Sequence, residues 1–202
     1  MIELDIFSDT VCPWCYIGKK RLEKAINNHK NLEFKQTWRP FQLNPGMPPD
    51  GMDRQEYLIS KFGSADAAKT IYDNIYDEGL LEGINFNFDS IQTTPNSFNS
   101  HRLLALAYKQ GIQENVLDSL FESYFLNGED IGDPNILLDI AIKHQIDAED
   151  FKTYLSDQEN IEPLANEEIE ARKMGINSVP TFIVNKQIVI NGAQTSENFD
   201  II

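Results

Sequence analysis

The chain has 202 residues, 41% of them hydrophobic, which is enough for one large domain or for a compact domain with a second, smaller one. Its 17 basic and 32 acidic residues give a formal net charge of -15, which disfavours binding to nucleic acid and to the acidic surface of a membrane. No run of about 18 apolar residues predicts a membrane span. The chain opens with neither a basic leader nor a small-residue cleavage site, so we expect a cytoplasmic protein.

The first forty residues carry the pattern of a strand, a helix and a second strand. Residues 2–8 alternate apolar and polar side chains, and the run Ser-Asp-Thr that follows predicts a turn. Apolar residues then recur at helical spacing from Pro13 to about Asn28, and a proline suits the first turn of a helix. Residues 32–39 alternate again and end before Pro40. We expect one strand-helix-strand unit with a right-handed crossover.

The two cysteines, Cys12 and Cys15, fall at the start of this predicted helix. With two residues between them the thiols lie about one helical turn apart, where a disulfide can open and close by thiolate attack. Backbone N–H groups and the helix dipole favour the thiolate form of Cys12, whereas Asp9, if ionised, would oppose it. We therefore expect Cys12 to be the nucleophile and Cys15, the more buried residue, to resolve the mixed disulfide.

Two other interpretations of the cysteine pair stay open on the residues alone. A zinc site would need two further ligands, and the three histidines, His29, His101 and His144, do not show the short spacing that metal sites favour. A structural pair is disfavoured because a strand-to-helix turn should expose at least one sulfur. We expect neither a metal nor a bound cofactor.

The middle of the chain has the composition of a separate helical region. The segment Phe41–Gly51 holds three prolines and two glycines, which indicates a loop and a boundary near residue 50. Helix follows helix over residues 51–162, with no convincing strand between them. We expect helices to be capped at Asp53, Ser64 and Asp147 and to begin at Asp133-Pro134 and around Pro95. One helix should end at Gly111.

The C-terminal part returns to strands. A helix from about Glu162 to Met174 should end at Gly175. Residues 181–185 and 187–190 should pair as an antiparallel hairpin, with the two residues Asn185 and Lys186 as the connection. The first unit and this hairpin would share one sheet, so residues 1–50 and 163–202 should form a discontinuous α/β domain. Residues 51–162 would be an insertion between its halves.

Two well-separated motifs resemble the DsbA family of thioredoxin-fold proteins. They are the run CPWCYIG at Cys12–Gly18, after a strand, and the run GINSVPTFIV at Gly175–Val184, before a hairpin. The run Asn96–Arg102 is similar to an Asn-(Ser/Thr)-x-x-Ala-His signature of the cytoplasmic FrnE-like branch, often labelled as polyketide-biosynthesis dithiol-disulfide isomerases. The resemblance implies a thioredoxin fold interrupted by an all-helical insertion domain.

The resemblance also implies a site. The Val179–Pro180 bond should be cis and lie against the Cys12 sulfur, so that Cys12, Cys15 and Pro180 form the catalytic set, with Pro13, Trp14 and Val179 beside the substrate. Trp14 stands where the strongest oxidants carry a histidine, which predicts a weaker oxidant. The family's closing helix would normally continue past the last residue, so we expect it to be short or truncated here.

Three polar side chains are further candidates for substrate binding. The signature suggests that His101, helped by Asn96 or Asn99, binds a substrate or a glutathione carboxylate in a cleft under the insertion, although a lone histidine is more often a satisfied core residue. Arg39 lies between two aromatic residues and could bind a carboxylate through both guanidinium nitrogens. The aromatic residues themselves, Trp38 and Phe41, should pack in the core.

The leading hypothesis is a thiol-disulfide oxidoreductase or isomerase that acts on protein or low-molecular-weight thiols and disulfides, with glutathione as a candidate co-substrate. A rival is a glutathione-dependent isomerase or transferase of the 2-hydroxychromene-2-carboxylate isomerase or kappa class. Such proteins share the interrupted thioredoxin fold that the resemblance implies, but they typically use a single serine or cysteine to activate glutathione. The second cysteine, Cys15, therefore favours redox chemistry. A second rival is a non-catalytic chaperone or interaction module. No feature of the sequence specifies an oligomeric state.

Overall fold

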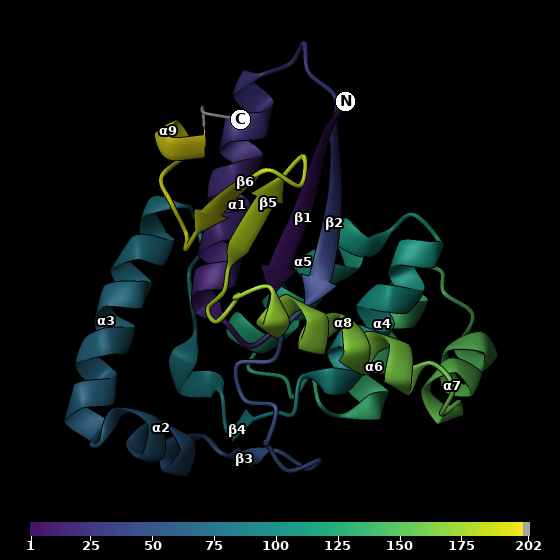
Figure 1. The fold of residues 1–202 in the computed structure, drawn as a ribbon. Helices are drawn as coiled ribbons and strands as arrows, with labels where there is room; N and C mark the ends of the chain where they lie inside the picture. The colour runs from purple at the N-terminus through teal and green to yellow at the C-terminus, as the bar shows by residue number, and fades with distance from the viewer. Residues whose placement is uncertain (200–202) are drawn as a thin grey trace. The chain divides into compact units, whose positions relative to one another are not determined.

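The computed structural model describes residues 1–199 (Figure 1). Contacts within the chain divide it into two compact units, one made of residues 1–43 with the residues from Gln158 onward, the other of Asn44–Asp157. The boundaries that we inferred from composition, at residues 50 and 163, lie further along the chain than these. No helix in the described part of the chain is long and apolar enough to span a membrane.

The first unit is built on a four-stranded sheet with the order β2-β1-β5-β6. Its strands are β1 (Ile2–Ser8), β2 (Phe34–Pro40), β5 (Thr181–Val184) and β6 (Ile188–Asn191). β1 runs parallel to β2, whereas β5 is antiparallel to both β1 and β6. The expected strand-helix-strand unit and the C-terminal hairpin are therefore confirmed, and both belong to one sheet.

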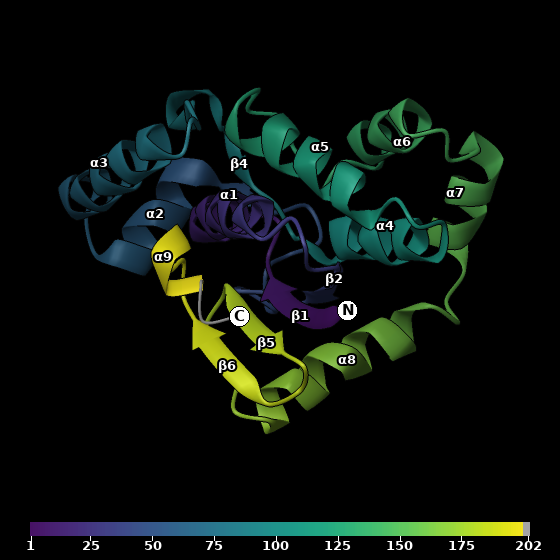
Figure 2. The same cartoon turned by 90° about the horizontal axis from the view of Figure 1, so that it is seen from above.

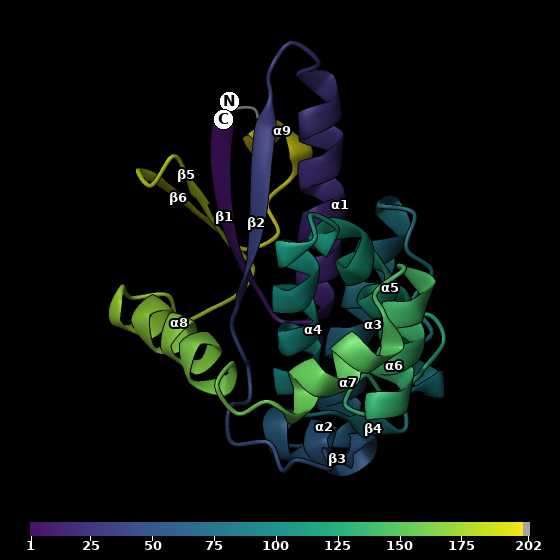
Figure 3. The ribbon, with the colours of Figure 1, turned by 90° about the vertical axis from the view of Figure 1, so that its right-hand side faces the viewer.

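Helices cover both faces of this sheet. They are α1 (Pro13–Asn28), α8 (Ile161–Lys173) and the short α9 (Ser196–Phe199). Figures 2 and 3 show α1 and α9 on one face and α8 on the other. Successive side chains of β1 point to opposite faces of the sheet, so the strand contributes to the apolar core on each face. Ile6 pairs with Phe182 on the α1 side, while Phe7 packs with Ala171 of α8 on the opposite side. The end of the expected closing helix lies outside the described residues.

The hairpin between β5 and β6 turns on two residues in the left-handed region. Asn185 has φ 48° and Lys186 has φ 59°, and the backbone N–H of Gln187 donates to the carbonyl of Val184 at 2.9 Å. Two-residue turns with positive φ match the twist of an antiparallel hairpin, and asparagine tolerates this conformation well. The two-residue connection expected from the sequence is confirmed.

The second unit is mainly helical. Its helices are α2 (Arg54–Phe62), α3 (Ala65–Leu81), the 3-10 helix η1 (Phe88–Ser90), α4 (Phe98–Lys109), α5 (Gln113–Phe125), α6 (Pro134–Lys143) and α7 (Ala148–Ser156). Asp53, Ser64, Asp133 and Asp147 cap α2, α3, α6 and α7 by accepting backbone N–H groups of the first turn. α4 begins at Phe98, slightly after the Pro95 that we expected to mark its start.

The expectation that no strand interrupts this unit is wrong in one detail. β3 (Met52–Asp53) and β4 (Thr93–Thr94) form a two-residue antiparallel ladder. Gly51 permits the approach, because it has φ 75° and a Cβ atom there would lie 2.7 Å from the carbonyl oxygen of Thr94. Two-residue strands carry no alternation for sequence analysis to detect.

Candidate redox site

The two cysteines lie at the junction between β1 and α1. Cys12 occupies the N-cap position of α1 in an extended conformation, Pro13 fills the first helical position, and Cys15 lies in the first turn. The backbone N–H of Cys12 donates to the carbonyl of Asp9 at 3.1 Å, and that of Cys15 to the carbonyl of Cys12 at 3.0 Å. Proline fits this position because its missing N–H has no intrahelical partner there. Trp14, half-buried, follows directly.

Both cysteines are free thiols, and both are buried. Cys12 is 3% exposed and Cys15 is 0% exposed, so the expectation that at least one sulfur would be exposed is wrong, although Cys12 remains the more accessible. The turn before the pair is itself packed into the interior, with Asp9 and Thr10 buried. Burial raises the pKa of the Cys15 thiol well above its usual range, and the adjacent Cys12 raises it further.

A distant segment completes the surroundings of Cys12. The Val179–Pro180 peptide bond is cis, and the Cys12 sulfur lies 3.8 Å from the carbonyl oxygen of Val179. The carbonyl of Pro180 accepts a hydrogen bond from the backbone N–H of Gly192 at 2.8 Å, which fixes this loop to the end of β6. The structure therefore brings together, within the first unit, the four residues that the resemblance placed in one site: Cys12, Cys15, Val179 and Pro180.

Asp9 has a structural role that sequence reasoning missed. Its carboxylate accepts the backbone N–H of Leu43 at 2.6 Å and that of Val11 at 3.4 Å. The side chain thus ties the segment after β2 to the turn that carries the cysteines. An aspartate two residues before an N–H donor is a sequence signal for the contact with Val11. The contact with Leu43 spans 34 residues and has no such signal.

Arg39 already has carboxylate partners within the protein. Its Nε lies 2.8 Å from a carboxylate oxygen of Asp5 on β1, and its Nη1 lies 3.6 Å from one of Glu167 on α8. A substrate carboxylate would therefore have to compete with Asp5, which weakens the binding role expected from the sequence. Trp38 and Phe41 are buried, in keeping with the expected packing role.

Asn96 and His101 belong to the second unit. The Asn96 amide donates to the carbonyl of Met47 at 2.7 Å, and its oxygen accepts the backbone N–H of Phe98 at 3.0 Å. Both halves of this amide thus hold the chain at the start of α4. His101 lies in the first turn of α4 and is buried. The four residues described above, Cys12, Cys15, Val179 and Pro180, belong to the first unit.

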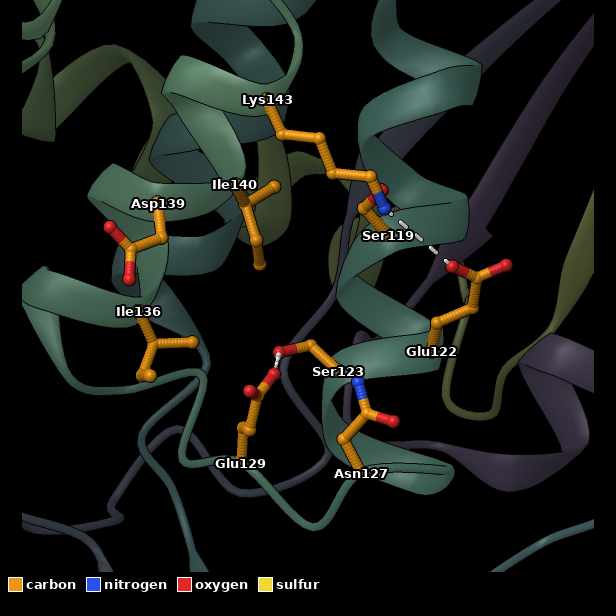
Figure 4. A pocket seen from close by; sticks show the side chains of 9 residues that line it. All are labelled: Ser119, Glu122, Ser123, Asn127, Glu129, Ile136, Asp139, Ile140 and Lys143. Atoms are coloured by element: carbon orange, nitrogen blue, oxygen red, sulfur yellow. Dashed lines mark hydrogen bonds and ion pairs between the residues drawn. The ribbon is translucent and has the colours of Figure 1, made fainter.

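A polar pocket of about 170 Å³ lies between α5 and α6 of the second unit (Figure 4). Lys143 pairs with Glu122 across it at 3.8 Å, and the Ser123 hydroxyl donates to Glu129. None of the residues assigned to a site from the sequence lines this pocket. Among residues 1–199, no group of three or more His, Cys, Asp or Glu side chains is arranged to hold a metal ion.

The sheet order, a Cys-x-x-Cys pair at the N-terminus of the first helix and a cis-proline ahead of the next strand of the sheet define a thioredoxin-fold protein with a helical insertion. Comparison with known families agrees. The model of the DSBA-like thioredoxin domain matches residues 3–201, and the chain belongs to this family of thioredoxin-fold oxidoreductases.

Solved structures show the same fold over nearly the whole chain. A probable DsbA oxidoreductase from Streptomyces coelicolor is 29% identical with a TM-score of 0.89, covering 100% of this chain and 88% of that one. A 2-hydroxychromene-2-carboxylate isomerase is 16% identical with a TM-score of 0.69, covering 95% and 89%. The cytosolic disulfide reductase DsbM from Pseudomonas aeruginosa, solved with glutathione, is 16% identical with a TM-score of 0.66, covering 94% and 89%.

Proposed function

We propose that the protein exchanges disulfides with protein or low-molecular-weight thiols through the Cys12–Cys15 pair. The observation that supports this most directly is the pairing of an N-cap thiol with a second, fully buried thiol in the same helical turn. The Val179 carbonyl, beside a cis-proline, lies 3.8 Å from the first sulfur. Such a site combines a nucleophile at a helix terminus with a resolving thiol within reach.

The exchange proceeds in two steps. The Cys12 thiolate attacks one sulfur of a substrate disulfide, a Cys12–substrate disulfide forms, and the departing substrate sulfur takes up a proton. Cys15, as a thiolate, then attacks the Cys12 sulfur and releases the second substrate sulfur. The substrate disulfide gains two electrons and the pair becomes a disulfide, which a thiol such as glutathione reduces again. Run backwards, the same steps oxidise a dithiol.

The segment around Pro180 supplies the binding surface on this proposal. Proline has no N–H, so the backbone of Val179 is left to pair with an extended substrate segment, as an edge strand would. Pro13 and Trp14 follow the nucleophile in the first turn of α1. The proline ring next to the thiol also keeps a further metal ligand from the sulfur.

The likeness to a cytosolic disulfide reductase solved with glutathione supports a cytoplasmic site of action, with glutathione as co-substrate. The rival activity, a glutathione-dependent isomerisation, shares the fold of the chromene-carboxylate isomerase. That chemistry needs one activated serine or cysteine and gives no role to a second thiol in the same turn. Cys15 therefore favours disulfide exchange.

Two serine variants test the assignment. Cys12→Ser should abolish disulfide exchange, whereas Cys15→Ser should accumulate a Cys12 mixed disulfide that mass spectrometry detects after incubation with oxidised glutathione. Iodoacetamide at mildly acidic pH should label Cys12 of the reduced wild-type protein before Cys15, and the opposite order would reverse the two roles.

The same variants distinguish the rival functions. Glutathione-dependent isomerisation that survives in Cys15→Ser would favour the isomerase, and client refolding that survives loss of both cysteines would favour a chaperone.

A further inference from the structure

The four-stranded sheet of the first unit has two edges of different character. β2 forms one edge and carries Lys35, Arg39 and Pro40, and charged residues and proline at an edge hinder pairing with another strand. β6 forms the other edge (Figure 2). Residues 187–195 contain no charged side chain, although the chain as a whole has a net charge of -15. β6 therefore lacks the charges and the proline that protect β2.

Two large apolar side chains of β6 are exposed, one on each face of the sheet. Ile188 is 45% exposed and Val189 is 55% exposed. Ile188 shares the α1 side of the sheet with the buried Ile190, and Val189 points to the α8 side. α9 packs over β5, because the ring centroid of its Phe199 lies 4.8 Å from that of Phe182. Both faces of the β6 edge are therefore accessible to a partner strand.

The backbone of β6 directs a set of unpaired groups outward. The N–H of Gly192 donates to the carbonyl of Pro180 at 2.8 Å, which sets the alternation along the ladder, so that the even-numbered residues of β6 bond to β5. The N–H and C=O groups of Val189 and the N–H of Asn191 therefore point away from β5. The carbonyl of Gln187 points the same way, because the N–H of its peptide group faces β5. None of these four groups forms a hydrogen bond within residues 1–199.

These four groups are complementary to themselves. The N–H of Gln187 already donates to the Val184 carbonyl at 2.9 Å, and the Asn191 carbonyl accepts the side-chain amide of Gln194 at 2.8 Å. Two donors and two acceptors remain on each copy of the chain. A two-fold axis beside Val189 matches all of them in an antiparallel pair of β6 strands. The two Val189 residues exchange both of their hydrogen bonds, and Asn191 of each copy donates to the Gln187 carbonyl of the other.

We propose that two copies of the chain associate through β6, which joins their sheets into one continuous sheet. The side chains support the same register, because Ile188 of each copy lies opposite Ile190 of the other, and the two Val189 side chains meet on the α8 side. A second copy matches this pattern by symmetry, whereas a client peptide brings a pattern of its own. The uncharged run also lets two acidic chains approach there with little local repulsion. The pairing uses no residue of the redox site.

Association should be weak, because a four-residue strand buries less surface than a standard protein–protein interface. Sedimentation equilibrium with a reductant present, from about 10 µM to about 1 mM protein, covers the dissociation constants expected of such a contact. The weight-average mass should rise toward that of a dimer with concentration. The rise should be steeper at high salt, which screens the repulsion between the two acidic chains. A protein that stays monomeric at every concentration and salt would overturn the proposal.

Charged variants at the symmetry axis test the register. Val189→Lys and Val189→Glu should each stay monomeric, since like charges would face each other, and an equimolar mixture of the two should associate again. Val189 is 55% exposed, so both side chains fit the monomer. Ile169→Lys is the matched control and should associate like the wild type, because Ile169 on α8 is 47% exposed and belongs to no strand.

Two results with these variants would contradict pairing through β6. They are a dimer of Val189→Lys as stable as that of the wild type, and a mixture of the two charged variants that does not associate. An extended client peptide that binds the wild type and not Val189→Lys, while the protein stays monomeric, would assign the edge to clients instead of a second copy.

Discussion

The Cys15 thiol connects chemistry and stability at the scale of a single residue. Its side chain is fully buried beside the Cys12 thiol, and burial raises its pKa well above the usual range. A thiol in the unfolded chain ionises near pH 8.5. The folded protein therefore holds the Cys15 proton at pH values where the unfolded chain has lost it, and stability must fall as pH rises through that interval.

The reduced protein should accordingly keep a constant free energy of unfolding up to about pH 8.5, and then lose up to about 1.4 kcal/mol per pH unit. Urea unfolding between pH 7 and pH 9.5 measures this slope. Cys15→Ala should remove the slope while retaining Cys12. Above pH 10 a second loss should appear in both proteins, because burial raises the pKa values of Tyr72 and Tyr124. An unchanged slope in Cys15→Ala below pH 9.5 would contradict the assignment.

At the scale of elements, the site depends on how closely α1 approaches the loop before β5. Gly18, one turn beyond Cys15, faces this loop. A Cβ atom at Gly18 would lie 3.0 Å from Cγ of Pro180 and 3.3 Å from the ring of Phe182. The pyrrolidine ring of Pro180 cannot rotate away, and its carbonyl is bonded to Gly192. Glycine is therefore the residue that lets the helix lie against the loop.

Gly18→Ala should lower stability despite the better helix propensity of alanine. Overpacking costs about 1–3 kcal/mol and the gain in propensity offsets about 1 kcal/mol, so we expect a net loss of roughly 1 kcal/mol in urea unfolding. Disulfide exchange should slow as well, because Pro180 would be displaced from Cys12. Gly46→Ala is the control, since no atom beyond the adjacent residues lies within 4 Å of the added carbon there. A Gly18→Ala protein that is more stable than the wild type and equally active would show that α1 and the loop before β5 leave room for the added methyl group.

At the scale of the whole molecule, net charge bears on the reduction potential that we expect for the Cys12–Cys15 pair. The chain carries a net charge of -15, and the residues between the cysteines, Pro13 and Trp14, add no positive charge. A strong oxidant owes its potential to a highly stabilised thiolate in its reduced form. Neither the two residues between the cysteines nor the overall charge supplies a cationic group for that purpose.

The reduction potential should therefore be intermediate, at roughly -160 to -240 mV, between about -270 mV for thioredoxin-like reductants and about -120 mV for the strongest oxidant. Such a value lies close enough to cytosolic glutathione for exchange in either direction. Equilibration in glutathione buffers, with the pair quantified by alkylation, gives the potential directly. A value near -120 mV would mean that a group not apparent in the sequence stabilises the Cys12 thiolate.

Features that depend on neighbouring residues could be predicted from the sequence. Alternation in β1, the proline at the start of α1, the side-chain caps of the second unit and the two-residue turn at Asn185-Lys186 each appear where expected. The spacing of Cys12 and Cys15 also fixed their separation to one helical turn. Each of these features is set by hydrogen bonds and side-chain directions within a few residues, which a local pattern reports.

Contacts between distant segments were decided only by packing in three dimensions. The carbonyl of Val179 reaches Cys12 across 167 residues, Asp9 binds Leu43, and Arg39 pairs with Asp5. The sequence likewise predicted an exposed sulfur, whereas the turn that carries it is buried. Resemblance to a family placed Pro180 beside the cysteines, but no periodicity did. Such pairings follow from which faces of the sheet and helices bury together, and a local pattern shows that a face is apolar without showing what covers it.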